Sequence, residues 1–183
     1  ATGTHYLDIT GEIPVFEAVA RQDDKAKAAG VVLLPGAGFD VVPSDCLAAA
    51  LAAELPDATE LELAFASAGG ISPGTSKTMI EGLPLGGCVR RDGRLTPVPT
   101  AHSVKEIPFA KRTLSAVSIP WGDVSTAYSS TKIPNIIVYM AMPKTAIRGM
   151  KATRAFSRLL GAKGVQSFLK GQVDRWVKGP DAA

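Results

Sequence analysis

Gly36 and Gly38 follow a short apolar run, and glycines in that position are the first sign of a dinucleotide-binding turn. The fingerprint needs a third small residue so that a helix can pack closely on its strand, but Val41 stands there. Pro35 also interrupts the approach to the turn. The stretch therefore fails as a phosphate-binding fingerprint, and a tight turn explains its glycines equally well.

Gly69 and Gly74 have the spacing of a nucleoside-triphosphate-binding loop. The lysine that should directly follow the second glycine is displaced to Lys77, so we favour a tight turn over a triphosphate site. Backbone amides of residues 69–78, with a helix expected to begin at Ser76, remain candidates for binding a single anionic group.

Reactive side chains are few. Cys46 and Cys88 lie far apart and neither is next to a second Cys or a His, so nothing indicates a disulfide framework or a zinc site. His5 and His102 are the two histidines, which excludes a multi-histidine metal site. No Ser stands in the pattern of a nucleophile elbow, so a hydrolase has little support. We expect two core thiols and no bound metal.

Composition limits the class of protein. The 183 residues are 46% hydrophobic with a net charge of +3, as in an ordinary folded domain. No apolar run approaches the about 20 residues that span a bilayer. No secretory leader is visible, so we expect a cytoplasmic protein. Aromatic residues do not alternate with basic ones, which disfavours nucleic-acid binding.

The first quarter of the chain alternates strands and helices. Residues 4–12 are typical of a strand entering a turn, and residues 31–34 of a buried strand that is apolar on both faces. Helices are expected over 14–29 and 43–55, each with Pro at its start. This order predicts part of a doubly wound parallel sheet. Because two strands cannot make such a sheet alone, we expect the rest of it to come from outside these residues.

From Glu60 the pattern becomes one of strands. Apolar and other residues alternate over 60–65, which is the period of a half-exposed strand. Asp92 and Gly93 suit the positive φ angles of a type I′ hairpin turn. Further strands are expected over 103–109, 113–119 and 134–142, with a short helix over 76–83. The middle third therefore predicts a mixed, mostly antiparallel sheet.

The tail is helical and basic. Residues 144–183 hold 9 Lys/Arg against 2 Asp/Glu, whereas residues 1–143 hold 11 against 15. Lys151, Arg154 and Arg158 share one helix face, which could meet an acidic acyl carrier protein, a phosphate-bearing thioester or an anionic membrane surface. A solvated face is the alternative explanation.

Three stretches, taken in order, go beyond generic α/β patterns. They are THYLDITGE (4–12), VVLLPGAGFDVVPSDCLA (31–48) and IPWGDVSTAYSSTKIPNIIVY (119–139). Together they resemble the saccharopine dehydrogenase-like oxidoreductases, and most of all the branch of the trans-acting enoyl reductases. Members of that family have an N-terminal Rossmann domain with the glycine fingerprint. A mixed-sheet domain follows, which binds substrate and often mediates dimerisation.

The resemblance implies two domains. Residues 1–55 correspond to the C-terminal part of the nucleotide-binding domain, without its fingerprint loop. Residues 56–183 correspond to the substrate-binding and dimerisation domain. The expected fold class is α/β to α+β: the tail of a doubly wound Rossmann-type domain, then a mixed, largely antiparallel sheet domain with C-terminal helices.

The resemblance also implies where NADP or NAD would lie. The turns after Asp8 and Leu34 correspond to strand ends that face the nicotinamide half of the cofactor, where α/β sheets place their ligands. The candidates for lining this cleft follow the two strands: Thr10, Gly11, Glu12, Gly36, Gly38, Phe39 and Asp40. Alternatively, the glycines serve only a tight turn and Asp40 is a turn residue.

The third stretch supplies the implied substrate pocket. Trp121, Asp123 and Thr126 are candidates for binding substrate, and Tyr128 is the candidate proton donor, with His5 as a second. A reductase needs only one positioned acid, or solvent, besides the hydride of its cofactor. The structural alternatives are that Trp121 packs under the sheet, that Tyr128 ends a strand and that His5 is hydrogen-bonded structure.

These inferences predict the substrate-side part of an NAD(P)-dependent oxidoreductase, homodimeric, that reduces an enoyl or acyl thioester, a lipid-like substrate or an imine. These residues alone are expected to be inactive and to bind cofactor weakly or not at all. The alternative is a non-catalytic module that holds an acyl chain or a partner subunit. An apolar pocket of Phe65, Trp121 and Tyr128 would favour that alternative.

Overall fold

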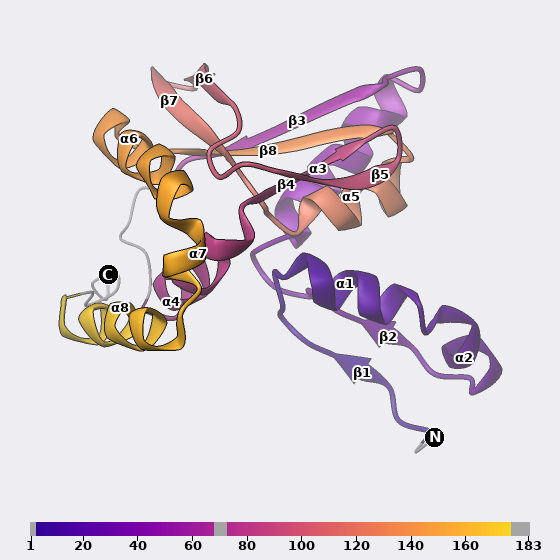
Figure 1. Cartoon of the computed structure of the whole chain (residues 1–183). Coiled ribbons are helices and arrows are strands. Elements are labelled where there is room, and N and C mark those ends of the chain that lie inside the picture. Colours follow the sequence, from indigo (N-terminus) through magenta and orange to yellow (C-terminus); the bar gives the residue numbers. More distant parts are fainter. Residues whose placement is uncertain (1–2, 68–72, 177–183) are drawn as a thin grey trace. The chain divides into compact units, whose positions relative to one another are not determined.

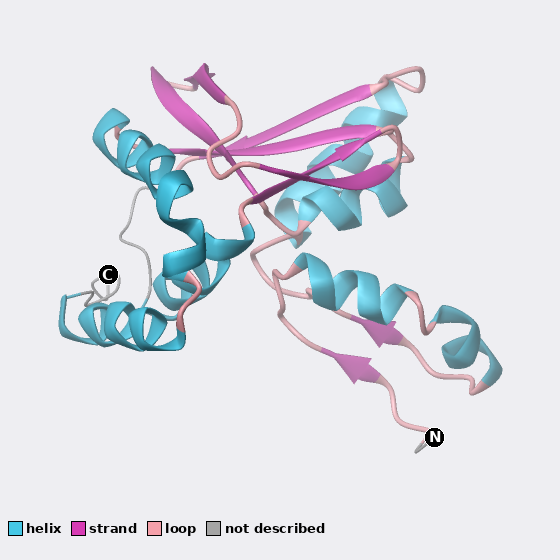
Figure 2. Cartoon of the chain, viewed as in Figure 1, coloured by secondary structure: helices cyan, strands magenta, loops and turns pink. Residues whose placement is uncertain are grey.

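The computed structural model describes residues 3–67 and 73–176 (Figure 1). It is a mixed α/β structure with a small parallel sheet, a six-stranded, largely antiparallel sheet and C-terminal helices (Figure 2). The strands are β1 (Tyr6–Leu7), β2 (Leu33–Leu34), β3 (Glu60–Phe65), β4 (Gly87–Arg91), β5 (Arg94–Val98), β6 (Val104–Phe109), β7 (Arg112–Ile119) and β8 (Asn135–Ala141). The helices are α1 (Ile13–Ala20), α2 (Asp23–Ala28), α3 (Val42–Glu54), α4 (Pro73–Gly82), α5 (Asp123–Thr131), α6 (Lys144–Ala152), α7 (Ser157–Leu160) and α8 (Lys163–Trp176), with short 3-10 helices η1 (Leu83–Leu85) and η2 (Thr153–Phe156).

The small sheet confirms the predicted strand–helix–strand unit. Strands β1 and β2 run parallel, with Tyr6 paired to Leu33 and Leu7 paired to Leu34. The connection between them passes through α1 and α2, as a parallel pair requires. The single helix expected over 14–29 is divided, because α1 ends at residue 20 and α2 begins with an acidic first turn.

One face of the small sheet is uncovered, so the prediction of a buried strand over 31–34 was wrong. Leu7 and Leu34 are paired and point to the same face, and Val32 follows the same alternation. These three side chains are 65%, 49% and 58% exposed, respectively. The apolar pattern is that of a strand with cover on both faces, but the described residues leave these three side chains without such cover.

The larger sheet has the strand order β5-β4-β8-β7-β6, and β3 pairs with β8. The strands predicted over 60–65, 103–109, 113–119 and 134–142 are present as β3, β6, β7 and β8. Side chains of β3 alternate between exposed and buried, as predicted. Asp92 and Gly93 have φ angles of 48° and 74°, which confirms the predicted turn between β4 and β5.

Helix α5 was not predicted, because the sequence suggested only loop and strand ends between β7 and β8. It begins after Gly122 and ends at Lys132, whose left-handed conformation (φ 63°) stops the helix. It packs against α1 and α3. Its buried residues are Asp123, Val124, Ser125 and Ala127. Packing of this buried face outweighs the weak helix propensity of a segment rich in Ser and Thr.

The chain forms two compact units, each assembled from separate stretches. The first holds Ala1–Leu63, Cys88–Thr96 and Pro120–Val138, and the second holds Ala64–Gly87, Pro97–Ile119 and Tyr139–Ala183. The domain boundary expected after residue 55 stays a prediction. Within the described ranges, no helix combines the length and the apolar character needed to cross a membrane.

Candidate functional site

Three segments of the first compact unit come together at the carboxyl ends of β1 and β2. They are the loop after β1 (residues 8–12), the loop after β2 (36–41) and the turn before α5 (120–123). We call them the strand-end cluster. All seven residues predicted to line a cofactor cleft lie in its first two segments, and Trp121 and Asp123 lie in the third.

Asp8 ties the two strand ends together. Its carboxylate accepts the backbone N–H groups of Thr10 at 2.9 Å and Gly36 at 2.8 Å, and its carbonyl accepts that of Ala37 at 2.7 Å. The Tyr6 hydroxyl also donates to this carboxylate. The hydrogen bond from Tyr6 and those from Gly36 and Thr10 hold the pKa of Asp8 below its usual value. The backbone N–H groups of Thr10, Gly36 and Ala37 are therefore already hydrogen-bonded within the protein.

Two glycines let the loops approach each other closely. A Cβ atom on Gly11 would lie 2.6 Å from the Asp40 Oδ2 atom. Gly36 has a φ of +72°, and a Cβ there would lie 2.5 Å from the ring of Phe16. The spaces that these glycines leave are filled by side chains of the protein, so the tight-turn explanation is favoured for Gly36.

The turn before α5 fits closely onto both loops. The Trp121 indole N–H donates to the backbone carbonyl of Asp40. A Cβ on Gly122 would lie 2.6 Å from Val41 Cγ1 and 2.8 Å from the Phe16 ring. No side chain larger than hydrogen fits there, so Gly122 is a positioning residue that the sequence analysis did not single out.

Asp123 is the most unusual group of the cluster. It is fully buried at the first position of α5, and neither carboxyl oxygen has a hydrogen-bond partner. The Ser44 hydroxyl lies near it but donates instead to the carbonyl of Val41 at 3.3 Å. Burial raises the pKa of Asp123 to about 6. The Ser44 hydroxyl can turn from Val41 to donate to the charged carboxylate, which opposes this rise, and the charges of Asp45 and Asp40 add to it.

Further acceptor oxygens surround the first turns of α3 and α5. The Asp45 Oδ1 atom and the Thr126 hydroxyl are also buried without a hydrogen-bond partner, while Asp45 Oδ2 accepts the Ser130 hydroxyl at 2.6 Å. The arrangement can take up a proton or accept hydrogen bonds. Across residues 3–67 and 73–176, no three His, Cys, Asp or Glu side chains are grouped so that they could hold a metal ion.

The remaining predicted cleft residues are more accessible. The Asp40 side chain is half-buried, and burial raises its pKa. Phe39 is 84% exposed, and the Thr10 hydroxyl accepts the N–H of Glu12 at 3.2 Å. Asp40 therefore combines a perturbed carboxyl with access to solvent, which is the combination expected of a group that exchanges a proton with a ligand.

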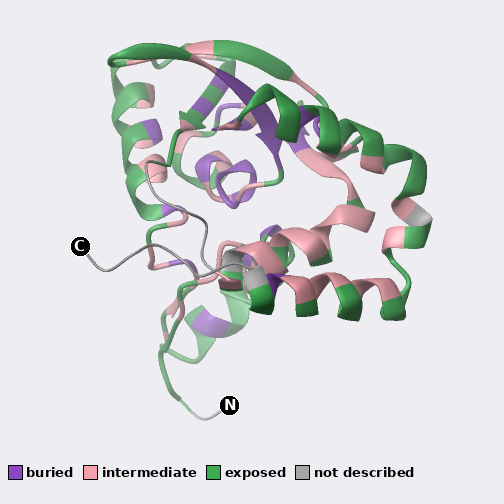
Figure 3. Cartoon of the chain, turned by 90° about the vertical axis from the view of Figure 1, so that its left-hand side faces the viewer, coloured by how far each residue is buried: buried purple, intermediate pink, exposed green. Residues whose placement is uncertain are grey.

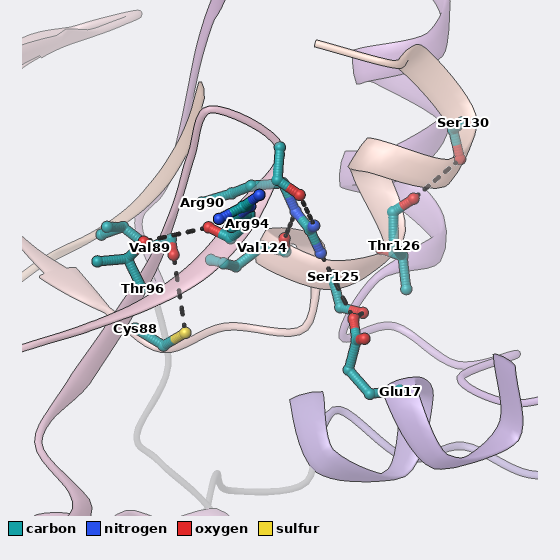
Figure 4. A network of polar contacts seen from close by, with 11 residues as sticks. Glu17, Cys88, Val89, Arg90, Arg94, Thr96, Val124, Ser125, Thr126 and Ser130 are labelled. Atoms are coloured by element: carbon teal, nitrogen blue, oxygen red, sulfur yellow. Dashed lines mark hydrogen bonds and ion pairs between the residues drawn. The ribbon is translucent and has the colours of Figure 1, made fainter. Parts of the chain in front are cut away.

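A buried arginine, missed by the sequence analysis, holds α1, α5 and the β4–β5 turn together (Figure 4). Arg90 donates to the carbonyls of Val124 and Gly93, at 2.8 Å each, and forms an ion pair with Glu17 at 3.4 Å. Glu17 also accepts the Ser125 hydroxyl at 2.6 Å. This network fixes the helix that carries Asp123.

Tyr128 belongs to the arginine network and not to the strand-end cluster. Its ring lies 4.4 Å from the Arg90 guanidinium, and its hydroxyl faces Gly93. Tyr128 follows Asp123 by five residues, so the two side chains leave α5 about 140° apart. Its role as proton donor stays a prediction, which this placement does not favour.

His5 also lies away from the cluster. It precedes β1, whereas the cluster follows the other end of that strand. The His5 Nδ1 atom accepts the backbone N–H of Val32 at 3.0 Å, which is the structural alternative considered for this residue. Of the loop over 69–78, residues 69–72 lie outside the described residues, and with them the anion site expected there.

Comparisons with known proteins leave the family open. No model of a known protein family matches the chain, and no curated protein matches its sequence.

Proposed function

We propose that this chain is the substrate-side part of an NAD(P)-dependent oxidoreductase that reduces an enoyl or acyl thioester, a lipid-like substrate or an imine. The observation that carries the proposal is the strand-end cluster, in which loops after two parallel strands meet the Trp121–Asp123 turn. The carboxyl ends of parallel strands are where α/β sheets bind nucleotide cofactors. The resemblance of residues 4–12, 31–48 and 119–139 to saccharopine dehydrogenase-like oxidoreductases supports the same proposal.

The uncovered face of β1 and β2 supports a larger Rossmann-type sheet. Parallel sheets in α/β proteins have helices on both faces, yet Leu7 and Val32 are more than half exposed. In our proposal, a second helical layer of the same protein covers this face, and further strands extend the sheet at its edges. Residues 1–55 are then the C-terminal part of the nucleotide-binding domain.

The residues of the cluster fit only part of a dinucleotide. Its amides at Thr10, Gly36 and Ala37 are already bonded to Asp8, so they do not offer a cradle for phosphate oxygens. Asp40 and Phe39 remain accessible and would line the nicotinamide end. When bound, the cofactor supplies hydride. In our proposal, the cofactor phosphates are bound by the further strands of the sheet and their loops.

The chain would contribute the proton that completes the reduction. Asp40 is the acid that its placement favours, because its carboxyl is accessible, lies against Gly11 and has a raised pKa. Trp121 acts as a positioning residue by holding the backbone of Asp40. The alternative of a non-catalytic acyl-binding module gains no support from Tyr128, whose ring stacks on Arg90.

Titration of NADPH and NADH tests the proposal. Each cofactor is added to this chain and to a version extended at its N-terminus along the natural gene, and binding is followed by cofactor fluorescence. We expect micromolar binding by the extended protein and at least a hundredfold weaker binding by residues 1–183. Tight binding by the shorter chain would contradict the division of the site. Absence of binding by the extended protein would contradict the proposed oxidoreductase function.

A further inference from the structure

Exposed apolar side chains gather on short helices of the second compact unit. Leu85 on η1, Phe156 at the end of η2 and Leu159 on α7 are 80%, 59% and 61% exposed. Helix α7 packs against η1 and directly follows η2, so the three side chains belong to one region. Figure 3, coloured by burial, shows that exposed residues recur along the C-terminal helices. Large apolar side chains grouped in water mark a binding surface.

Lysines flank these apolar side chains. Lys163, at the start of α8, lines a cavity of about 550 Å³ together with Leu85. Lys151 is exposed near the end of α6, two residues before η2 begins, and α6 packs against η2, which ends at Phe156. Neither lysine has an ion-pair partner among residues 3–67 and 73–176, whereas Lys170 in the same cavity is paired with Glu81. We call Leu85, Phe156, Leu159, Lys151 and Lys163 the basic apolar patch.

We propose that the basic apolar patch docks on the surface of an anionic lipid membrane. The charge of this region suits such a surface, because residues 144–183 hold 9 Lys/Arg against 2 Asp/Glu. Apolar side chains enter the boundary between headgroups and acyl chains, while lysines remain beside the lipid phosphates. The proposal concerns a contact with the surface and not a span.

The same observations disfavour protein partners. A second copy would bring two unpaired sets of lysines against each other, which is repulsive. Three apolar side chains cover far less than the about 800 Å² that each partner buries in a standard protein interface. A fluid lipid surface needs no matching shape and attracts each nearby lysine separately.

Co-sedimentation with vesicles tests the proposal without cofactor or substrate, so its outcome is independent of the oxidoreductase proposal. One vesicle set contains phosphatidylcholine alone, and the other contains about one third phosphatidylglycerol. We expect binding to the anionic vesicles only, and loss of that binding at high salt. Equal binding to both sets, or binding to neither, would overturn the proposal; an acidic protein as the true partner would give the second result.

The charge of the patch is tested by the double variant Lys151→Glu and Lys163→Glu. Each lysine near an anionic surface contributes separately, so binding to anionic vesicles should weaken at least tenfold. The control is Lys111→Glu with Arg112→Glu, which makes the same charge change at the exposed turn between β6 and β7. An equal loss in both variants would show that net charge, and not the patch, determines binding, and would contradict the proposal.

The apolar part has a closely matched control. Leu159→Ser should weaken binding several-fold, because Leu159 no longer enters the lipid boundary. Leu55→Ser removes a leucine of similar exposure, 57% against 61%, at the end of α3 in the first compact unit. That variant should bind as the unaltered chain does. Unchanged binding by Leu159→Ser would show that the apolar side chains do not enter the membrane, and would overturn the docking mode.

Discussion

The strand-end cluster and the C-terminal helices α6–α8 use their residues in opposite ways. In the cluster, Cβ atoms built on Gly11, Gly36 and Gly122 would all lie within 3 Å of other atoms. Among the C-terminal helices, Gly149 and Gly171 have nothing within 4 Å of the corresponding point. The strand-end cluster is therefore a closely packed site, whose function depends on the exact positions of its side chains. The C-terminal helices present a surface, and binding there depends on the charge and exposure of their side chains.

Removal of Arg90 should have the largest effect and tests whether α5, the helix that carries Asp123, depends on the arginine network. Arg90→Ala leaves the carbonyls of Val124 and Gly93 without a donor and Glu17 without its counter-charge. We expect the free energy of unfolding to fall by about 3–5 kcal/mol in chemical denaturation. Arg112→Ala, at an exposed position of β7, serves as control and should cost less than about 0.5 kcal/mol. Similar losses in both variants would contradict the assigned role of Arg90.

Asp123 makes the stability of the folded protein depend on pH. Its pKa is about 6 in the folded protein against 3.8 ordinarily, so the folded state binds this proton more tightly. The contribution of Asp123 to stability is therefore greatest below about pH 4, falls as pH rises towards about 6 and is constant above that. The total loss is about 3 kcal/mol at most.

Asp123→Asn should remove the loss of stability that ionisation of Asp123 causes as pH rises. Urea unfolding at several pH values would show the variant gaining stability relative to the parent chain as pH rises from about 4 to about 6. Asp57→Asn, at the exposed turn between α3 and β3, controls for the loss of one carboxyl group. A constant difference between Asp123→Asn and the parent at all pH values would refute the assignment.

A pair of glycine substitutions compares the two regions directly. Gly122→Ala forces a methyl group to within 2.6 Å of Val41, so we expect a loss of about 1–3 kcal/mol. Gly149→Ala, inside α6, meets open space and should stabilise the protein by about 0.5–1 kcal/mol. Thermal unfolding measures both. Stability changes of opposite sign would support the contrast between the packed strand-end cluster and the exposed C-terminal helices. Equal changes in the two variants would contradict it.

Much of the fold could be predicted from local patterns. The alternation over 60–65 and the Asp92-Gly93 pair indicate β3 and the β4–β5 turn, because strand period and turn chemistry are local properties. Helix α5 could not be predicted in this way. Its Ser and Thr residues have weak helix propensity, and its packing against α1 and α3 depends on residues far away in the sequence.

The candidate site was predictable in part, because the strands that position its loops have recognisable local patterns. The loops after Asp8 and Leu34 follow two parallel strands, and parallel strands bring such loops together. Nothing in the sequence indicates that Asp123 lacks a hydrogen-bond partner or that Arg90 is buried. Nor does it show that the Tyr128 ring lies on Arg90. These are properties of tertiary contacts, which residue types and spacing do not encode individually.

Hydrogen exchange with and without NADPH, in the N-terminally extended protein, tests most directly whether the strand-end cluster lines the nicotinamide site. The account predicts slower amide exchange at residues 8–12 and 36–41 when NADPH is bound, because the cofactor covers these loops and restrains their opening. It predicts no change in α6–α8. Bound NADPH that leaves both loops unprotected, or that protects the C-terminal helices instead, would contradict the proposed site.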